Sequence, residues 1–347
     1  MRLEVEKSPD RAEWDDGAER AGGSIFHSSA WANYAVRELP NVVPQFISLV
    51  SDAGERAGVA LGFYEQSPKK LIKPLSGRLW FDTIPAVSAA HRDALGQFIR
   101  LLEEHARKEG AVELFFDSFA YRGGAAELEQ AGFEVMRRLE FELGLERSEE
   151  ELWSGLEYKR AKNIKKAMRS GVSIRNLPPG EGLLELRRLQ SESGQRIIER
   201  GGPDITFRGR DGVDPVEVLL ESGRARIMGA EVEGAIVSAG LFTNFNGLVY
   251  YNLSGHSRRA LETQAGTLML WETIKQYRLE GATRFNFGGC KFDSMNEDSP
   301  EHGVYVYKKA FGATCLECAS GLKILRPAAR KIVGTLKSVL NRAGQAE

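Results

Sequence analysis

Hydrophobic positions follow two different periods along this chain, and together they predict an α/β fold. Alternation of apolar and polar residues is typical of strands, and recurrence of apolar residues every three or four positions is typical of helices. Strands are expected at residues 45–50, 59–65, 70–74, 112–116, 133–145, 172–176, 225–231, 235–244, 247–254, 283–287 and 314–319. Helices are expected at residues 88–108, 124–131, 149–152, 156–170, 182–200, 266–280 and 304–310. We therefore expect mixed sheets flanked by helices.

Two segments about 171 residues apart share the same local order. Residues 106–116 (ARKEGAVELFF) and 277–287 (YRLEGATRFNF) each end a predicted helix, pass through Glu-Gly-Ala and begin a predicted strand. Each is followed by a helix that closes on a Gly/Phe pair. An internal repeat of this kind indicates a duplicated domain. We expect domains at residues 1–146 and 147–325, followed by a basic amphipathic helix at 326–347.

Composition and charge are those of a globular protein. The chain has 347 residues, 42% of them hydrophobic, and its 47 Lys+Arg against 48 Asp+Glu give a net charge of −1. It is long enough to bury a core without disulfides or metals. Because its N-terminus lacks the apolar stretch of a signal peptide and no window of about 18 residues is fully apolar, we expect a cytoplasmic protein.

Several kinds of site are missing from the sequence. There is no Walker loop, no G-x-G-x-x-G after a strand, no HExxH and no G-x-S-x-G elbow. The histidines show no metal-ligand spacing, and Cys315 and Cys318 form a lone C-x-x-C on a predicted strand. Residues three apart on a strand face opposite ways. We therefore expect reduced, partly buried cysteines and no metal, with a metal at this pair as the alternative.

A basic helix is predicted at residues 158–170. It holds six basic residues and no acidic one. Lys159, Lys162, Lys166 and Arg169 fall on one face, and an apolar stripe of Ala161, Ile164 and Met168 is expected on another. Such a face can attract a phosphate-rich ligand. A helix face that is simply solvated is the alternative.

A second candidate site lies in the late block, residues 303–312, which holds two tyrosines, two lysines and a closing Phe-Gly. Gly288 and Gly289 follow the strand upstream of it. Glycines allow close approach of a ligand or of another backbone, and a lysine beside them can stabilise an oxyanion. A capped helix with ordinary surface lysines is the alternative.

Four segments, in this order, carry a family resemblance. They are residues 26–34 (FHSSAWANY), 158–167 (YKRAKNIKKA), 264–271 (QAGTLMLW) and 307–312 (YKKAFG). Together they resemble the Fem-like (FemABX) aminoacyltransferases, which build peptidoglycan cross-bridges, and acetyltransferase-like proteins of the GNAT superfamily. The resemblance spans nearly the whole chain. It implies two tandem GNAT-like domains, in agreement with the duplication.

The resemblance also implies site residues. Lys308 would lie near the transferred acyl group and Asp117 would act as a base or a positioning residue. Substrate binding is implied for His27, Trp31, Tyr34, Lys159, Arg160, Lys162, Asn163, Lys166, Asn252, Ser254, Gly288, Gly289, Tyr307 and Phe311. Donor phosphate is expected at Arg258, Arg259, Gly266 and Thr267. The sequence departs from the family after Tyr34, where Arg37 is the nearest cation in place of a lysine.

The expected activity is transfer of an acyl or aminoacyl group to an amine acceptor, such as a cell-wall precursor peptide, which can be lipid-linked. Direct attack by an amine needs positioning and an oxyanion donor rather than a hydrolytic triad. Acyl-CoA or aminoacyl-tRNA would be the co-substrate, and no bound cofactor is expected. The alternative is a non-catalytic GNAT-like module that binds RNA or a phosphate-bearing cell-envelope precursor.

The C-terminal segment, residues 322–346, holds six basic residues and no acidic one. Pro327 suits a first helical turn. The apolar positions that follow fit either docking onto the protein's own surface or peripheral contact with the inner membrane face.

Overall fold

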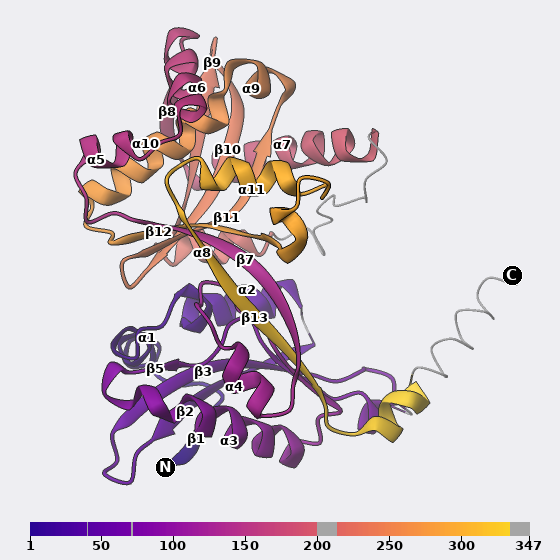
Figure 1. The fold of residues 1–347 in the computed structure, drawn as a ribbon. Coiled ribbons are helices and arrows are strands. Elements are labelled where there is room, and N and C mark those ends of the chain that lie inside the picture. The colour runs from indigo at the N-terminus through magenta and orange to yellow at the C-terminus, as the bar shows by residue number, and fades with distance from the viewer. Residues whose placement is uncertain (40, 71, 200–213, 334–347) are drawn as a thin grey trace, which may run out of the picture. The chain divides into compact units, whose positions relative to one another are not determined.

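The computed structural model of the protein describes residues 1–39, 41–70, 72–199 and 214–333 (Figure 1). The chain forms two compact units. Unit 1 comprises Met1–Arg138 and the chain from Glu317 onward, and unit 2 comprises Leu139–Leu316. The chain leaves unit 1 within β7 (Glu134–Gly144) and returns within β13 (Thr314–Ile324). The expected domain limits at residues 146 and 325 stay predictions. None of the described helices is long and apolar enough to cross a membrane.

Unit 1 is a mixed sheet with helices packed on it. Its elements are β1 (Arg2–Glu6), α1 (Arg11–Arg20), η1 (Ile25–His27), α2 (Ser29–Glu38), β2 (Val42–Val50), β3 (Arg56–Glu65), η2 (Lys73–Leu75), β4 (Arg78–Phe81), β5 (Ala86–Val87), η3 (Ala89–Ala94), α3 (Leu95–Lys108), β6 (Glu113–Phe116) and α4 (Ala125–Gln130). Within it the strand order is β1-β2-β3-β4-β6-β13, and β5 pairs with β3. Pairs are antiparallel except β4 with β6, which is parallel.

Helix α3 supplies much of the core of unit 1. The residues that it buries recur every three or four positions and pack against apolar side chains of β2, β3, β4 and β6. The helix expected at residues 88–108 is confirmed, although its first turns, Ala89–Ala94, are 3-10. The strand expected at residues 70–74 is wrong, because Lys73–Leu75 forms a 3-10 turn. Pro74 lacks a donor for a strand ladder and favours the turn.

Unit 2 is also built on mixed strands flanked by helices. Its elements are α5 (Glu149–Ser154), α6 (Tyr158–Arg169), β8 (Ser173–Leu177), α7 (Pro179–Glu199), α8 (Val216–Glu221), β9 (Ala225–Val232), β10 (Ala235–Phe245), β11 (Leu248–His256), α9 (Arg258–Thr263), α10 (Ala265–Leu279), β12 (Arg284–Lys291), η4 (Phe292–Met295) and α11 (His302–Lys309). The strand order is β7-β12-β11-β10-β9-β8. Strands β8, β9, β10 and β11 pair antiparallel with one another, and β11 pairs in parallel with β12.

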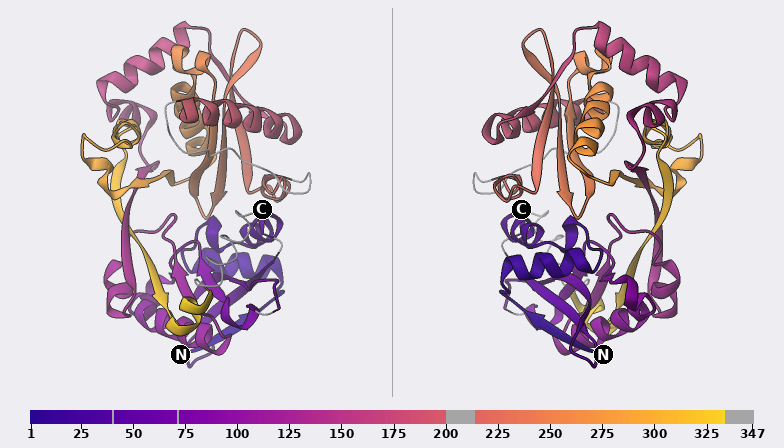
Figure 2. Two further views of the ribbon diagram at one scale, coloured as in Figure 1. Left: turned by 90° about the vertical axis from the view of Figure 1, so that its right-hand side faces the viewer. Right: turned by 90° about the vertical axis from the view of Figure 1, so that its left-hand side faces the viewer.

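Helices α7 and α10 cover opposite faces of this sheet (Figures 1 and 2). A β-carbon at Gly255 would lie 2.6 Å from the Leu189 β-carbon on α7, and one at Gly240 would lie 2.9 Å from the Met269 methyl on α10. Glycine at these positions therefore lets both helices approach the sheet closely. Helix α10 is buried over most of its surface, which explains its apolar sequence.

The duplicated segments adopt the same structure in both units. Helices α3 and α10 both end in a Schellman turn, in which Ala111 N donates to Ala106 O and Ala282 N donates to Tyr277 O, each at 2.9 Å. The intervening Gly110 and Gly281 have φ of +76° and +88°. Each turn leads into a strand that pairs in parallel with an earlier strand of its unit, β6 with β4 and β12 with β11. The local order that the two sequence segments share is therefore present in both units.

The C-terminal segment packs on unit 1 as far as it is described. Residues 327–333 are helical, and Leu325 and Ala329 are buried. Arg326 Nη1 donates to Pro74 O at 3.1 Å. The remainder of the helix expected at 326–347 lies outside the described residues.

Candidate functional site

The candidate site of unit 2 is built where two parallel strands part. Strands β11 and β12 pair only at Leu248–Tyr250 with Arg284–Asn286, although they continue to His256 and Lys291. A bulge follows on β11, because Leu253 and Tyr251 face consecutive residues of β10. Asn252 is the extra residue, and its side chain accepts a hydrogen bond from Thr243 Oγ1 at 2.8 Å. Bulges of this kind re-aim side chains next to functional sites.

Lys308, Gly288 and Gly289 lie together at this break. Lys308 Nζ donates to Gly289 O at 2.7 Å. A β-carbon at Gly288 would lie 3.6 Å from Lys308 Nζ, 3.7 Å from the Tyr250 hydroxyl and 3.4 Å from Tyr251 O. Gly288 has φ of +71°, which glycine adopts without strain. The structure therefore brings the Lys308 ammonium and the Tyr250 phenol to the same stretch of backbone, which carries no side chains.

A buried carboxylate, which we did not predict, supports this cluster. Glu140 on β7 is fully buried. It accepts hydrogen bonds from the Tyr250 hydroxyl at 2.9 Å and from Asn286 Nδ2 at 2.8 Å. Asn286 Oδ1 in turn accepts from Gly288 N at 2.7 Å. The network thus links Glu140 to the backbone beside Lys308.

Arg160 is the buried member of the basic helix α6. Its Nη2 donates to Tyr307 O at 2.9 Å, and its guanidinium carbon lies 4.0 Å from the Tyr307 ring centroid and 4.8 Å from that of Phe311. Nη1 donates to Thr267 Oγ1 at 3.4 Å. Burial lowers the pKa of Arg160. The predicted residues Arg160, Thr267, Tyr307 and Phe311 are therefore in contact.

The other basic residues of α6 face outward. The exposed ones are Lys159, Lys162, Lys165, Lys166 and Arg169, and Asn163 is half-buried. The buried stripe of α6 is Arg160, Ile164 and Ala167. Of our expected stripe, Ile164 is buried and Ala161 packs against the core, but Met168 is wrong because it is 47% exposed. The two aromatic rings that stack on Arg160 stabilise its guanidinium on the inner face.

The start of α10 is an uncapped helix N-terminus. Its N-cap residue, Gln264, has φ of +62°, and no side chain caps the helix. Ala265, Gly266 and Thr267 are buried there. The His256 ring covers Gly266 so closely that a β-carbon there would lie 2.8 Å from His256 Cε1. Uncapped N–H groups and the helix dipole favour an anion at such an end.

His256 itself is neutral in this environment. Its Nδ1 lies 2.7 Å from Ser238 Oγ. Burial lowers the pKa of His256 to about 4, and the positive charge of Arg196 contributes in the same direction. The ring therefore packs against the start of α10 without adding a charge there.

The two arginines predicted to bind donor phosphate are paired with carboxylates instead of lying free. Arg258 bonds Glu199 at 3.3 Å, and Arg259 lies 3.4 Å from Glu233. Both arginine side chains are at least half exposed. Ser254 lies on β11 opposite Gly240, two residues beyond the bulge.

Unit 1 has its own cluster where β4 and β6 end. These strands are parallel with Phe81 opposite Phe116, so the residues that follow them, Asp82 and Asp117, lie side by side. Asp117 Oδ1 accepts from Ser118 N and from Ser320 Oγ, each at 2.8 Å, and lies 3.5 Å from Arg138 Nη1. Burial raises the pKa of Asp82 to about 6, and the charge of Asp117 adds to the rise.

Trp31 connects the early aromatic block to this cluster. Its Nε1 donates to Asp82 Oδ2 at 2.7 Å, and its ring stacks on Tyr34 with centroids 4.7 Å apart. His27 has a structural role, because Ser24 N donates to its Nδ1 and its Nε2 lies 3.1 Å from Ile84 O. Burial lowers the pKa of His27 to about 4.

We did not predict Asp82 as a site residue, although a repeated sequence pattern points to it. Leu79-Trp80-Phe81-Asp82 before one helix parallels Leu114-Phe115-Phe116-Asp117 before the next. Glu140 and Glu142 carry no such signal, since they alternate with apolar residues as on a half-exposed strand. Among the described residues, no cluster of three or more His, Cys, Asp or Glu could hold a metal ion. Cys315 is half-buried and Cys318 is buried on β13.

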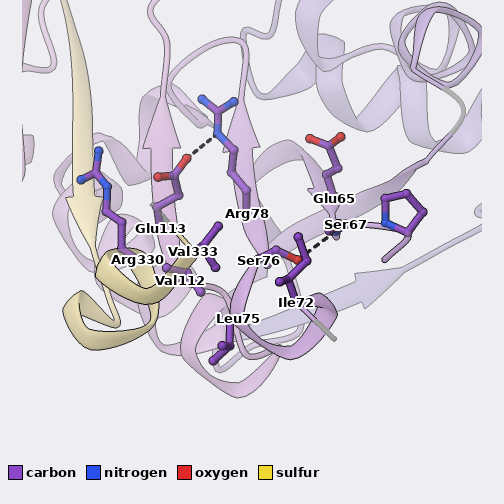
Figure 3. Close-up of a pocket in the computed structure, with 12 residues that line it drawn as sticks. Glu65, Ser67, Ile72, Leu75, Ser76, Arg78, Val112, Glu113, Arg330 and Val333 are labelled. Atoms are coloured by element: carbon purple, nitrogen blue, oxygen red, sulfur yellow. Dashed lines mark hydrogen bonds and ion pairs between the residues drawn. The ribbon is translucent and has the colours of Figure 1, made fainter. Parts of the chain in front are cut away.

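A cavity of about 530 Å³ lies in unit 1, at the beginning of β4 and β6 (Figure 3). Arg78, Glu113, Glu65 and Arg330 line it together with apolar side chains. Arg78 begins β4, whose other end leads to Asp82. The cavity therefore lies away from the Asp82–Asp117 cluster, and none of the predicted site residues lines it.

Residues 184–309, most of unit 2, match a family model described as an acetyltransferase (GNAT) domain. Over these residues unit 2 is similar to a GNAT acetyltransferase domain. The match includes the parted strands, α10 and Lys308. No curated protein sequence matches the chain.

Solved structures resemble both units together. FemX has a TM-score of 0.78 at 18% identity, covering 96% of this chain and 100% of its own. L-PGS from Bacillus licheniformis has a TM-score of 0.58 at 17% identity, covering 99% of each chain. A tandem GNAT protein from the clavulanic acid biosynthesis pathway has a TM-score of 0.53 at 15% identity, covering 93% and 98%. The Fem-like, tandem GNAT fold implied by the sequence is confirmed.

Proposed function

We propose that the GNAT domain of this protein transfers an acyl or aminoacyl group from an activated donor to an amine. The observation that carries the proposal is the meeting of Lys308 and Tyr250 at Gly288, where β11 and β12 part. This places a cation and a hydroxyl beside backbone that carries no side chain. Such preorganised groups stabilise the negative charge that forms when an amine attacks a carbonyl.

The donor would be anchored by its phosphates at the start of α10. The N–H groups of the first turn, which no side chain caps, would offer hydrogen bonds to an anion. Arg160 adds a buried positive charge that already contacts Thr267. Acyl-CoA and aminoacyl-tRNA both carry phosphates and an activated carbonyl, so this anchor suits either donor.

Lys308 would act on the oxygen of the carbonyl under attack. The amine nitrogen forms a bond to the carbonyl carbon, and negative charge develops on the oxygen. The Lys308 ammonium, held by Gly289 O, then neutralises that charge. A single oxyanion donor of this kind contributes about 10²- to 10³-fold in rate.

In unit 1, we place a cationic part of the acceptor at Asp82 and Asp117. Two neighbouring carboxylates attract an ammonium, and the Trp31 and Tyr34 rings beside them can contact a cation through their faces. Cell-wall precursor peptides and lipid-linked forms of them carry such amines. The similarity of fold to FemX agrees with an acceptor of this class.

The exposed basic face of α6 supports a second candidate function. Five cations there have no acidic residue on their own helix. The same surface would serve a non-catalytic module that binds RNA or a phosphate-bearing envelope precursor. Such a module would bind its ligand without turnover.

The test is transfer of label. The purified protein is incubated with radiolabelled acetyl-CoA, or with tRNA charged with a labelled amino acid, and a panel of amine acceptors. We expect label to move to an amine from one of the two donors. Binding of both donors with no transfer to any acceptor would instead favour the binding module.

A further inference from the structure

Two segments of unit 1, far apart in the sequence, carry basic residues and no acidic ones. Residues 66–77 (QSPKKLIKPLSG) and 322–333 (LKILRPAARKIV) hold three and four Lys or Arg, in a chain with 47 basic and 48 acidic residues. Neither segment takes part in the function proposed above. Five of these cations have exposed side chains and form what we call the basic rim, namely Lys69, Lys70, Lys73, Arg326 and Arg330.

The fold brings the two segments together. Arg326 Nη1 donates to Pro74 O at 3.1 Å, although the two residues are 252 positions apart. Both segments also line the cavity of about 530 Å³ (Figure 3), through the side chains of Ile72, Leu75, Arg330 and Val333. Cations that are gathered on one surface raise its positive potential and attract anions. The basic rim therefore lies beside a cavity that both segments help to build.

The cavity combines an apolar lining with few uncompensated carboxylates. Val112, which is 5% exposed, joins Ile72, Leu75 and Val333 in the apolar part of the lining. Of the two carboxylates that line the cavity, Glu113 is paired with Arg78 Nε at 2.9 Å and Glu65 is half-buried. The volume is that of an ordinary small-molecule site. A ligand that suits both parts carries a negative charge next to an apolar group.

We propose that the basic rim and this cavity bind an anionic phospholipid at a membrane surface. The lipid phosphate would lie among the rim cations, and the apolar part of the lipid would contact Ile72, Leu75 and Val333. Exposed Lys and Arg side chains strengthen attraction to an anionic leaflet, each by a similar amount. The proposal does not depend on acyl transfer, because it concerns other residues than the candidate site.

The apolar side chains favour a lipid over a nucleic acid as the ligand. Proteins that bind single-stranded nucleic acid combine cations with aromatic side chains, on which the bases stack. Neither of the two segments contains Phe, Tyr or Trp. The basic face of α6 differs in this respect, since Tyr158 at its start is 83% exposed. The two basic surfaces therefore suit different ligands.

Co-sedimentation of the full-length protein with vesicles tests the proposal. We expect binding to vesicles of equal parts phosphatidylcholine and phosphatidylglycerol, and much weaker binding to phosphatidylcholine alone. The triple variant Lys69→Gln, Lys70→Gln, Lys73→Gln should lower the partition coefficient for the mixed vesicles about 10²-fold, since each cation contributes roughly fivefold. The matched control is Lys7→Gln, Arg11→Gln, Arg20→Gln, which removes the same charge from exposed positions elsewhere in unit 1. It should bind as the wild type does.

A second variant tests the apolar contact. Leu75→Ser keeps every cation of the basic rim, and we expect it to lower the partition coefficient for the mixed vesicles about tenfold. Ile72→Ser is a second variant of the same kind, and thermal unfolding shows whether each variant is folded. Leu279→Ser, which removes a 79% exposed leucine of unit 2, should leave vesicle binding unchanged.

Several outcomes would overturn the proposal. It is wrong if the wild-type protein does not bind the mixed vesicles, or if the control triple variant loses as much affinity as the rim variant. Folded Leu75→Ser and Ile72→Ser proteins with wild-type partition coefficients would exclude the cavity from lipid binding. Loss of affinity for tRNA but not for vesicles in the rim variant would assign this surface to nucleic acid. Because the assay contains no acyl donor or acceptor, these outcomes are independent of the proposed function.

Discussion

The Arg160 guanidinium lies 4.0 Å from the Tyr307 ring centroid and donates to the carbonyl oxygen of the same residue at 2.9 Å. One side chain of α6 therefore fixes both the ring and the backbone of the residue before Lys308. Through Thr267 it also reaches the first turn of α10. The two ends of the proposed donor site share this one buried cation.

Replacement of Arg160 by lysine should cost both stability and activity. A lysine ammonium cannot form the paired hydrogen bonds and the stacked contact of a planar guanidinium. We expect Arg160→Lys to lower the free energy of unfolding by about 2 kcal/mol and to lower kcat. Urea denaturation and the transfer assay measure the two effects. Arg169→Lys, exposed on the same helix, is the control and should change neither.

Loss of Lys308 should affect turnover far more than folding. The Lys308 side chain is tied to Gly289 O and packs at the surface of α11, where no residue is fully buried. We expect Lys308→Ala to reduce kcat about 10²- to 10³-fold with an unchanged circular dichroism spectrum. Lys309→Ala on the same helix should stay active. A folded Lys308→Ala protein with wild-type turnover would remove this lysine from the mechanism.

The overall fold was predictable because its main elements carry strong local signals. The apolar run of α10 and the Glu-Gly-Ala turns at Gly110 and Gly281 are visible in the sequence, and the structure confirms them. Helices α1 and α2 were not predicted. Their buried residues are mostly small, such as Gly17, Ala18 and Ala32, so they leave no stripe of large apolar side chains.

The candidate site was less predictable, because burial of polar residues depends on partners distant in sequence. Arg160 resembles its lysine neighbours, and only the rings of Tyr307 and Phe311, about 150 residues later, place it on the inner face. Glu140 is buried because Tyr250 and Asn286 supply its hydrogen bonds. No local pattern contains that information. Lys308 was predicted from its sequence motif and not from the residues that surround it in the structure.

Charge reversal on α6 should weaken binding of a phosphate-bearing ligand. Lys162 and Lys166 are exposed on the same face of the helix. For a nucleic-acid ligand, Lys162→Glu with Lys166→Glu should reduce the slope of log affinity against log salt by about 2. Fluorescence titration with tRNA at several salt concentrations measures it. Reversal of Lys7 and Lys108 in unit 1 is the control, and an equal effect there would indicate only a general charge response.

The helix at residues 327–333 should stabilise unit 1 through its buried side. Ala329 is 4% exposed, whereas Ile332 on the same helix is 48% exposed. We expect Ala329→Asp to lower the free energy of unfolding by about 2 kcal/mol, since it buries a carboxylate, and Ile332→Asp to leave it nearly unchanged. Denaturant unfolding measures both. The alternative that this segment contacts a membrane would gain support if Ile332→Asp abolished binding of the protein to anionic vesicles.

Asp82 should make unit 1 less stable as the pH rises through the acidic range. Burial raises its pKa from 3.8 to about 6, so between these values the folded protein binds the proton more strongly than the unfolded chain does. The stability that the neutral form contributes is therefore lost between about pH 4 and pH 6, and it stays lost above pH 6.

The variant Asp82→Asn tests this prediction, because it keeps an acceptor for Trp31 and carries no charge. We expect this variant to match the wild type at pH 4 and to exceed its free energy of unfolding at pH 7 by on the order of 2 kcal/mol. Asp16→Asn, at an exposed position, should show no such difference, and equal wild-type and Asp82→Asn stabilities at pH 7 would contradict the raised pKa.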